Sequence, residues 1–324
     1  MSTPNIRSLA VLVGALAAGC AGAQTYPSKV VRSIVPSAPS GSIDVVGRLV
    51  AQKLGEQMGQ SFIVENRAGA AGTIGVTSVA KSPPDGYTLL VASQSGVSAA
   101  PSLIRNLPYD PQRDLTPIVL MVIQPSVLVV HPSLPVRTTR DFIALAKAKP
   151  DMLTYGSSGI GATQHLSAAL FAMMTGTSLR HIPYKGGALA MTDLLGGQIY
   201  FMFSPVPTAT PFLSANKMRA LAVTSTRRIE SIPDVPTLDE SGVKGYDFSS
   251  WIGLLGPANL PKPIVAKLHD EATKAVNDPG LKKKLLDLGV LIPAPMTPDQ
   301  FGAFIKQDTA MTARIVKAAN VQPE

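Results

Sequence analysis

A loop of small residues between a strand and a helix constrains this chain more than any other stretch. An apolar β-type run at residues 30–35 stops at a segment of Pro, Ser, Ala and Gly, and apolar residues then recur at helical spacing as far as Leu54. Ser40 or Gly41 can be the N-cap of the predicted helix, which puts Asp44 in its first turn. Asp44 either caps the helix or contacts a ligand or an ordered water. Because the first N–H groups of a helix lack intrahelical partners and carry the positive end of its dipole, the loop is predicted to bind an anion.

The same pattern returns about 120 residues later, at residues 154–166. A short strand ends in a loop of Gly and Ser, and a helix follows with Leu166, Leu170 and Phe171 on one side. Two loops that each lead into a helix N-terminus suggest two similar lobes gripping one negatively charged ligand. The pattern therefore favours a binding protein.

Strand-like runs and amphipathic helices alternate along the chain, which predicts an α/β fold of two lobes. Each lobe is expected to be a mainly parallel sheet flanked by helices, with the ligand cleft between the lobes. The expected helices include 42–58, 139–148, 262–277 and 298–318, and the expected loops include 93–96 and 204–210. The predicted division is a signal peptide at 1–23, the first part of lobe 1 at 24–128, lobe 2 at 129–250, and the return to lobe 1 with the C-terminal helices at 251–324.

The N-terminus is typical of a secretory signal peptide. Arg7 precedes an apolar stretch at 9–18, and Ala21-Gly22-Ala23 forms a small-residue cleavage site. Cys20 is the only cysteine and lies in a sequence that resembles a lipoprotein cleavage box, but the adjacent Ala-Gly-Ala site favours a cleaved, periplasmic chain over a lipid-anchored one. The mature chain then has no disulfide, so its stability must come from core packing.

Charge and composition narrow the class of ligand. The formal net charge is +8, but the basic residues are dispersed and the densest run, Lys282-Lys283-Lys284, is expected on the solvated face of a helix. Aromatic residues do not interleave with the basic ones as single-stranded nucleic acid would require, so no nucleic acid partner is predicted. A basic background suits a small anionic ligand, because it raises the local concentration of that ligand.

The sequence offers no evident place for catalysis, a metal or a cofactor. His131 and His181 have no acidic partner at catalytic spacing, while His165 lies in the first turns of the second-loop helix and can face the cleft. No serine follows a strand in a Gly-x-Ser-x-Gly turn, and no His/Cys/Asp cluster has the spacing of metal ligands. The small-residue loops contain neither a Gly-x-Gly-x-x-Gly fingerprint nor a P-loop lysine. We therefore predict a non-enzymatic protein without a cofactor.

Short motifs in a fixed order carry a family resemblance over nearly the whole mature chain. The first half contributes residues 35–44, 65–72 and 83–90, and the second half contributes 155–159, 181–186, 193–198, 219–224 and 234–237. Together they resemble the Bug family of extracytoplasmic solute receptors, also called tripartite tricarboxylate transporter receptors. The resemblance implies a two-lobed periplasmic-binding-protein fold and delivery of a small carboxylate to a membrane permease.

The resemblance also implies where the ligand lies. A ligand carboxylate is expected between the two loops, held by backbone N–H groups and bridging waters. The ligand-binding residues implied in this way are Ser37, Ala38, Ser40, Gly41, Ser42 and Asp44 in the first loop, Ser157, Ser158, Gly161, Ala162 and Thr163 in the second, and Ser93, Gln94, Ser204 and Pro205 beside them. Structural roles are favoured for Arg67 and Lys185.

Ser204 stands where many members of the family have Asp. A serine neither pairs with an amino group nor repels a second carboxylate, so an amino acid is disfavoured and a di- or monocarboxylate, aromatic acids included, is favoured. Two other functions remain open from the sequence: a ligand-loaded sensor component that signals to a membrane kinase, and a secreted hydrolase. The receptor is expected to be a monomer.

Overall fold

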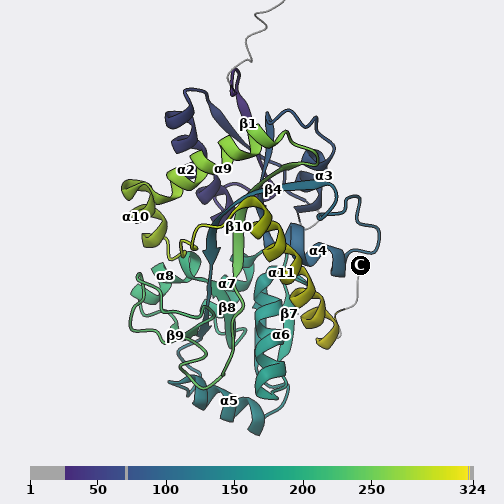
Figure 1. Ribbon diagram of the computed structural model, residues 1–324. Helices are drawn as coiled ribbons and strands as arrows, with labels where there is room; N and C mark the ends of the chain where they lie inside the picture. The colour runs from purple at the N-terminus through teal and green to yellow at the C-terminus, as the bar shows by residue number, and fades with distance from the viewer. Residues whose placement is uncertain (1–25, 70–71, 320, 322–324) are drawn as a thin grey trace, which may run out of the picture.

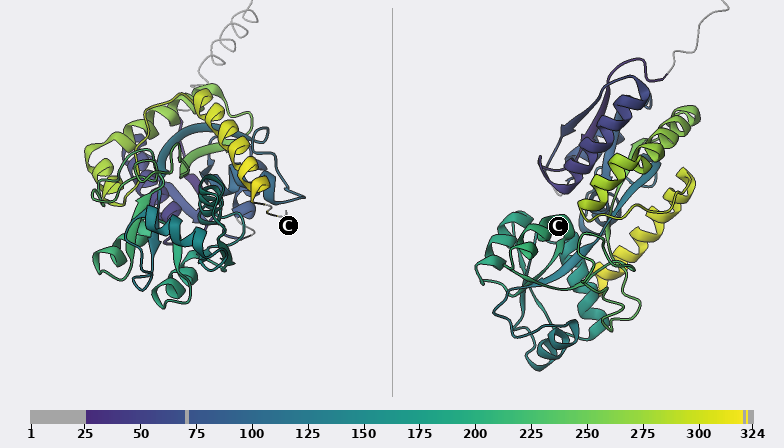
Figure 2. Two further views of the ribbon diagram at one scale, coloured as in Figure 1. Left: turned by 90° about the horizontal axis from the view of Figure 1, so that it is seen from below. Right: turned by 90° about the vertical axis from the view of Figure 1, so that its left-hand side faces the viewer.

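The strands in the described part of the chain form two separate five-stranded sheets (Figure 1). The computed structural model describes residues 26–69, 72–319 and 321. The predicted signal peptide at 1–23, with Cys20, lies outside the described residues. The two sheets sit in two bodies, one above the other in Figure 1 and in the right-hand view of Figure 2.

The first sheet joins strands from both ends of the chain. Its order is β2 (Phe62–Asn66), β1 (Val31–Val35), β3 (Thr88–Ser93), β10 (Ser250–Pro257), β4 (Leu115–Gln124). One face of the sheet packs against α2 (Ser42–Met58), α9 (Lys262–Asn277) and α10 (Pro279–Asp287). The other face packs against α3 (Thr73–Ala80), a short π-helix η2 (Ser95–Ala99) and the first half of α11 (Pro298–Ala318).

The second sheet lies within one continuous segment. Its order is β7 (Arg180–Pro183), β6 (Thr154–Ser157), β8 (Phe201–Pro205), β5 (Ser126–Val130), β9 (Arg219–Val223). One face packs against α5 (Thr139–Ala148) and α6 (Thr163–Thr175), and the other against α7 (Gly187–Leu195) and α8 (Val206–Ser214).

The predicted fold class, two lobes each built on a helix-flanked sheet, is confirmed. Both sheets are mixed, because β10 and β5 run antiparallel to both of their neighbours while the other pairings are parallel. Two predicted loops are wrong. Residues 95–99 are helical, and the segment predicted as a loop at 204–210 is the end of β8 followed by α8. The sequence of the second segment misled because it holds Pro205 and Pro207, yet proline is tolerated in the first turn of a helix, where N–H groups have no intrahelical acceptor.

The chain passes from one sheet to the other at Pro125, between β4 and β5, and returns between β9 and β10. Sheet membership thus changes three residues before the predicted boundary at 128, and β10 already belongs to the first sheet at Ser250. The last helix adds a connection that the sequence did not predict. In α11, Phe301 belongs to the core of the first sheet, whereas Ile315 belongs to the core of the second. Figures 1 and 2 show this yellow helix running from the upper body to the lower.

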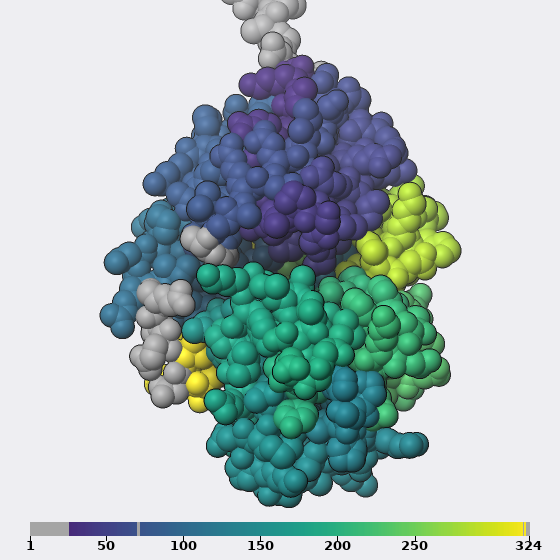
Figure 3. All heavy atoms as spheres, turned by 180° about the vertical axis from the view of Figure 1, so that it is seen from behind, coloured from purple at the N-terminus to yellow at the C-terminus, as the bar shows by residue number. Residues whose placement is uncertain are grey.

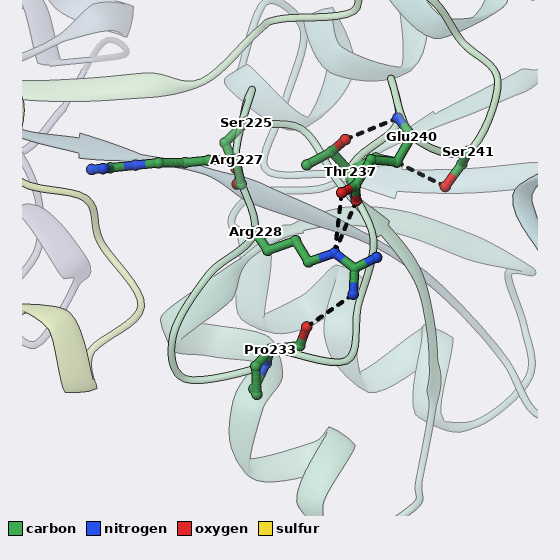
Figure 4. A network of polar contacts seen from close by, with 7 residues as sticks. All are labelled: Ser225, Arg227, Arg228, Pro233, Thr237, Glu240 and Ser241. Carbon is green, nitrogen blue, oxygen red and sulfur yellow. Dashed lines mark hydrogen bonds and ion pairs between the residues drawn. The ribbon is translucent and has the colours of Figure 1, made fainter.

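The long return from β9 to β10 is held by polar contacts instead of regular structure (Figure 4). The Arg228 guanidinium donates to Glu240 Oε2 at 3.0 Å and to the carbonyl oxygen of Pro233 at 3.3 Å. Glu240 Oε2 in turn accepts from the backbone N–H of Thr237 at 2.8 Å. These contacts hold residues 228–240 of the return together.

Candidate functional site

Residues from both lobes line a small cavity of about 180 Å³. Seen from behind in Figure 3, the surface is hollowed between the purple and blue body and the teal body. The cavity is walled by the first residues of two helices and floored by the strands that connect the lobes. The lining residues are Ser42, Ile43, Ser93, Ser95, Gln124, Ser126, Ser158, Ala162, Thr163, Gln164, Pro205 and Ser250.

Two helices from different lobes begin at this cavity. The N-cap of α2 is Gly41 and that of α6 is Ala162, and within the described chain neither helix has a side-chain cap hydrogen bond. By contrast, Thr138 caps α5 and Thr297 caps α11 through capping boxes away from the cavity. The starts of α2 and α6 therefore leave N–H donors and positive dipole ends for a ligand.

Asp44 shapes the first loop. Its Oδ2 accepts from the backbone N–H of Ser40 at 2.9 Å and from Arg48 Nε at 3.0 Å, and its Oδ1 accepts from Asn66 Nδ2 at 2.8 Å. Burial raises the pKa of this carboxyl, but the bonds from Arg48, Asn66 and Ser40 outweigh burial and hold the pKa below its usual value. Asn66 Nδ2 also donates to the carbonyl oxygen of Ser37 at 3.1 Å. Asp44 thus bonds to the N–H of Ser40, before the N-cap Gly41, and organises the loop, while its contact with a ligand or an ordered water stays a prediction.

A stacked pair of histidines, His165 buried and His181 half-buried, holds the second loop. Ser157 Oγ lies 2.7 Å from His181 Nε2 and accepts from the backbone N–H of Gly159 at 3.1 Å. His165 Nδ1 accepts from the backbone N–H of Gly161 at 3.0 Å, and the two imidazoles stack with centroids 4.0 Å apart. Burial lowers the pKa of each histidine to about 4, and for His181 the neighbouring His165 adds to the effect. Both rings are therefore neutral at pH 7, and they fix the loop from behind the cavity.

Gln94 connects the lobes beside the cavity. Its Nε2 donates to Asp308 Oδ1 of α11 at 3.0 Å, and its Oε1 accepts from Thr163 Oγ1 at the start of α6 at 3.4 Å. Asp308 Oδ2 also accepts from Trp251 Nε1 at 2.8 Å. Burial raises the pKa of Asp308, against the hydrogen bonds that favour its ionised form. This chain of bonds joins β10, the residue between β3 and η2, α11 and α6 across the lobe boundary.

The structure brings some predicted site residues together and places others behind or outside the cavity. Those that line it are Ser42, Ser93, Ser158, Ala162, Thr163 and Pro205. Those that do not are Ser37, Ala38, Ser40 and Gly41 in the first loop, with Asp44 beneath them, and Gln94, Ser157, Gly161 and Ser204. Gly161 lies against Leu103 of α4 (Ala100–Leu103), since a Cβ there would overlap that leucine. Ser204 is fully buried, and its Oγ donates to the carbonyl oxygen of Pro205 at 3.3 Å. That the lining residues contact a ligand stays a prediction.

Half of the lining was not found from the sequence. Ile43, Ser95 and Gln164 sit next to predicted residues and could have been reached by extending the helix starts by one turn. Gln124, Ser126 and Ser250 are different, because they come together through strand pairing. Their only sequence signal is that each is a polar residue at the end of a long apolar run.

The cavity lining contains no charged side chain among the described residues. Arg67 instead lies 3.4 Å from Glu65, in keeping with the structural role favoured for it. In the described ranges there is no group of three or more His, Cys, Asp or Glu placed to hold a metal ion. Nor does that part of the chain contain a helix long and apolar enough to cross a membrane. A larger hollow of about 740 Å³, between β4, α9 and α11, belongs to the first lobe alone.

Two mixed sheets in separate bodies, with one polar cavity between them, define a solute-binding receptor of the periplasmic-binding-protein class. Residues 46–321 match the family described as tripartite tricarboxylate transporter family receptor, and the chain belongs to this family. It is 34% identical to protein BugT of Bordetella pertussis over 296 residues, which is 91% of this chain and 90% of BugT.

Solved structures agree with the family assignment. Rpa4515 of R. palustris with adipate is 35% identical, with a TM-score of 0.84 over 92% of this chain and 100% of that one. MatC of Rhodopseudomonas palustris with bound malate is 30% identical, with a TM-score of 0.79 over 90% of this chain and 100% of that one. The resemblance inferred from the sequence motifs is thereby confirmed.

Proposed function

We propose that this receptor captures a small organic carboxylate in the cavity between its lobes and delivers it to a tripartite tricarboxylate-type permease in the membrane. The observation that carries the proposal is the convergence of α2 and α6, one from each lobe, on one cavity. Backbone N–H groups and dipole ends at two helix starts hold an anion without a cationic side chain, which agrees with the uncharged lining. The adipate and malate in the structures of related receptors support a carboxylate as the ligand.

Among the di- and monocarboxylates expected from the sequence, the lining favours an aliphatic acid over an aromatic one. Nine of its twelve residues are Ser, Thr or Gln, and in the described chain it includes no aromatic residue. A cavity of about 180 Å³ suits a small acid. A ligand with polar groups along its length matches such walls better than an aromatic acid does.

Ligand capture is coupled to movement of the lobes in this proposal. The connections at Pro125 and between β9 and β10 allow the lobes to close, and the bond from Thr163 to Gln94 is made across the boundary. A ligand held by both α2 and α6 stabilises the closed form, which presents a different surface to the permease. The receptor acts in the periplasm as a monomer, and cleavage after residue 23 releases it there.

Ligand binding can be tested by a thermal-shift screen of the purified receptor against mono-, di- and tricarboxylates, aromatic acids and amino acids. A ligand at 100 times its Kd stabilises the folded form by about 2.7 kcal/mol, so the melting temperature rises for one class of carboxylate. Ser42→Tyr, which fills the cavity at the start of α2, should abolish the shift. Ser61→Tyr places the same side chain at an exposed serine away from the cavity and should leave the shift intact.

The screen must begin with chain from which any copurified ligand has been removed by unfolding and refolding, with mass spectrometry of the extract. If the ligand-free protein melts at the same temperature with every carboxylate, the proposed function is wrong.

A further inference from the structure

A second pocket, of about 430 Å³, lies behind the second loop, between α6, the edge of the second sheet at β7 and the end of α11 (Figure 1). It shares no described lining residue with the cavity between the lobes. Five of its twelve described lining residues are alanines of α6 and of the end of α11, and the rings of Tyr155, His165 and His181 also line it. We call this largely apolar hollow, with two imidazoles in its wall, the imidazole pocket.

The hydrogen bonds of the second loop fix which ring nitrogens carry hydrogen. Ser157 Oγ donates to the carbonyl oxygen of Gly159 at 2.8 Å, so in its contact with His181 Nε2 the imidazole is the donor. His165 Nδ1 accepts from the backbone N–H of Gly161. In a neutral imidazole one nitrogen carries hydrogen and the other is an acceptor. His165 therefore carries its hydrogen on Nε2, and His181 keeps an acceptor at Nδ1.

These two nitrogens are left for a ligand of the imidazole pocket. Among the described residues neither His165 Nε2 nor His181 Nδ1 has a hydrogen-bond partner, and neither belongs to the unpaired side-chain atoms that are closed to solvent. His165 is only 7% exposed, and its ring stacks on that of His181 with centroids 4.0 Å apart. Polar groups at a buried wall are nearly always paired, so a donor and an acceptor side by side indicate a ligand that supplies both partners.

The two nitrogens discriminate between ligands by charge. A carboxylate offers acceptors alone and meets the lone pair of His181 Nδ1, while an ammonium group offers donors alone and meets the N–H of His165. A metal ion needs a lone pair that His165 does not have, because its Nδ1 is bonded to Gly161 and its Nε2 carries hydrogen. A primary carboxamide, by contrast, has an acceptor and donors on adjacent atoms.

We propose that the imidazole pocket is a second binding site, for an uncharged molecule that carries a primary carboxamide on an apolar body. The carbonyl oxygen accepts from His165 Nε2–H, and the amide N–H donates to His181 Nδ1. The alanine walls contact the apolar body. This site goes beyond the proposed function, because it lies behind the second loop and requires no carboxylate between the lobes.

Nuclear magnetic resonance titration of the ¹⁵N-labelled receptor tests the site, because long-range spectra resolve the ring nitrogens of the four histidines. The probes are cyclohexanecarboxamide, cyclohexyl methyl ketone and cyclohexanecarboxylate, which share one ring and nearly one shape. The ketone has a methyl group in place of the amino group and so lacks the donor, and the carboxylate lacks the donor and carries a charge. Each probe is titrated into the wild type and into Ser42→Tyr, whose cavity between the lobes is filled.

Cyclohexanecarboxamide should shift His165 Nε2, His181 Nδ1 and the backbone amide of Gly161 saturably, with equal affinity in both proteins. The Gly161 amide should respond because a ring that donates at Nε2 accepts more strongly at Nδ1. The ketone should bind at least about tenfold more weakly, since it leaves the acceptor of His181 unpaired. The carboxylate should leave these resonances unchanged in Ser42→Tyr.

Two leucine variants locate the binding. Ala172→Leu fills the imidazole pocket from a half-buried position on α6 and should abolish the shifts. Ala144→Leu adds the same side chain at an exposed position of α5 in the same lobe and should leave binding intact. Should Ala172→Leu fail to fold, Ala169→Leu, at another residue that lines the pocket, must give the same loss.

Four results would overturn the inference. They are a titration in which cyclohexanecarboxamide gives no saturable imidazole shift, equal affinities for the carboxamide and the ketone, undiminished binding in Ala172→Leu, and loss of binding in Ser42→Tyr, which would place the probe between the lobes. None of them concerns capture of a carboxylate, so the thermal-shift screen decides the proposed function separately.

Discussion

Gly161 and Leu103 are in close contact at the junction between the lobes. Gly161 lies in the second loop with φ at +72°, and Leu103 ends α4 in the segment before the first crossing. A Cβ built on Gly161 would overlap Leu103 Cδ1 and lie 3.0 Å from its Cγ. Leu103 itself packs against the core of the second sheet. Replacing Gly161 by alanine therefore drives a side chain into the junction between the lobes.

The cost of Gly161→Ala has two parts. A left-handed backbone conformation costs a residue with a Cβ about 1–2 kcal/mol. Overpacking costs about 1–3 kcal/mol more, because Cγ as well as the methyl group is too close, and rotation about χ2 alone does not move Cγ. We expect Gly161→Ala to lower the free energy of unfolding by roughly 2–5 kcal/mol in total.

A double-mutant cycle separates the two parts. Leu103→Ala removes the atoms that the new Cβ would meet, so Gly161→Ala in that background should cost only the backbone part. Urea unfolding of the four proteins should give a coupling energy of about 1–3 kcal/mol. The overlap exists only when the lobes touch, so Gly161→Ala should also weaken ligand binding about 5- to 150-fold. In the double variant the affinity should return to that of Leu103→Ala.

Additive costs would refute this reasoning. A coupling energy within about 0.5 kcal/mol of zero is what independent sites give, and it would mean that Gly161 and Leu103 do not touch in solution.

Further predictions follow from the groups around the cavity. Asp44→Ala leaves the N–H of Ser40 without its acceptor, so ligand affinity measured by calorimetry should fall about tenfold even though Asp44 does not line the cavity. The pKa values of His165 and His181 are lowered to about 4 by burial, so the unfolded chain binds protons that the folded chain does not between pH 6.5 and 4. The free energy of unfolding, measured with urea, should therefore fall as the pH drops through that window and stay level above it, with a smaller fall in His165→Gln. Trp251, the only tryptophan, should change its fluorescence when ligand binds, and Asp308→Asn should shift its emission without ligand.

Local patterns were enough to predict most of the elements. The helices at 42–58, 139–148, 262–277 and 298–318 have the bounds expected, because helical spacing, caps and prolines near the first turn are all local signals. The prediction of a loop after Phe203 was wrong for the converse reason. Its prolines suggested a loop, but burial of Val206 and Ala209 against the second sheet makes it helical, and burial partners are not visible in a local window.

The same distinction between local and long-range signals separates the site residues that were predicted from those that were missed. Ser42 and Thr163 were predicted because a helix start can be recognised from the residues around it. Gln124 and Ser250 were missed because their proximity depends on the register between β4 and β10, which are far apart in the sequence. Asp44 was predicted in the right turn, but its bond from Asn66 of β2 was not, because that contact depends on the pairing of distant segments.

Pro125 joins the two lobes at the floor of the cavity. The backbone step that carries the chain from one sheet to the other also places Gln124 and Ser126 in the lining, and the N–H of Val206 at the start of α8 donates to the Pro125 carbonyl oxygen at 3.2 Å. A ligand group that bonds to this floor bonds to residues whose backbone must adjust when the lobes move. A ligand shifts the equilibrium between the open and closed forms only by its difference in affinity for them. Contacts at this crossing change when the lobes move, so they favour closure more than contacts to one lobe alone.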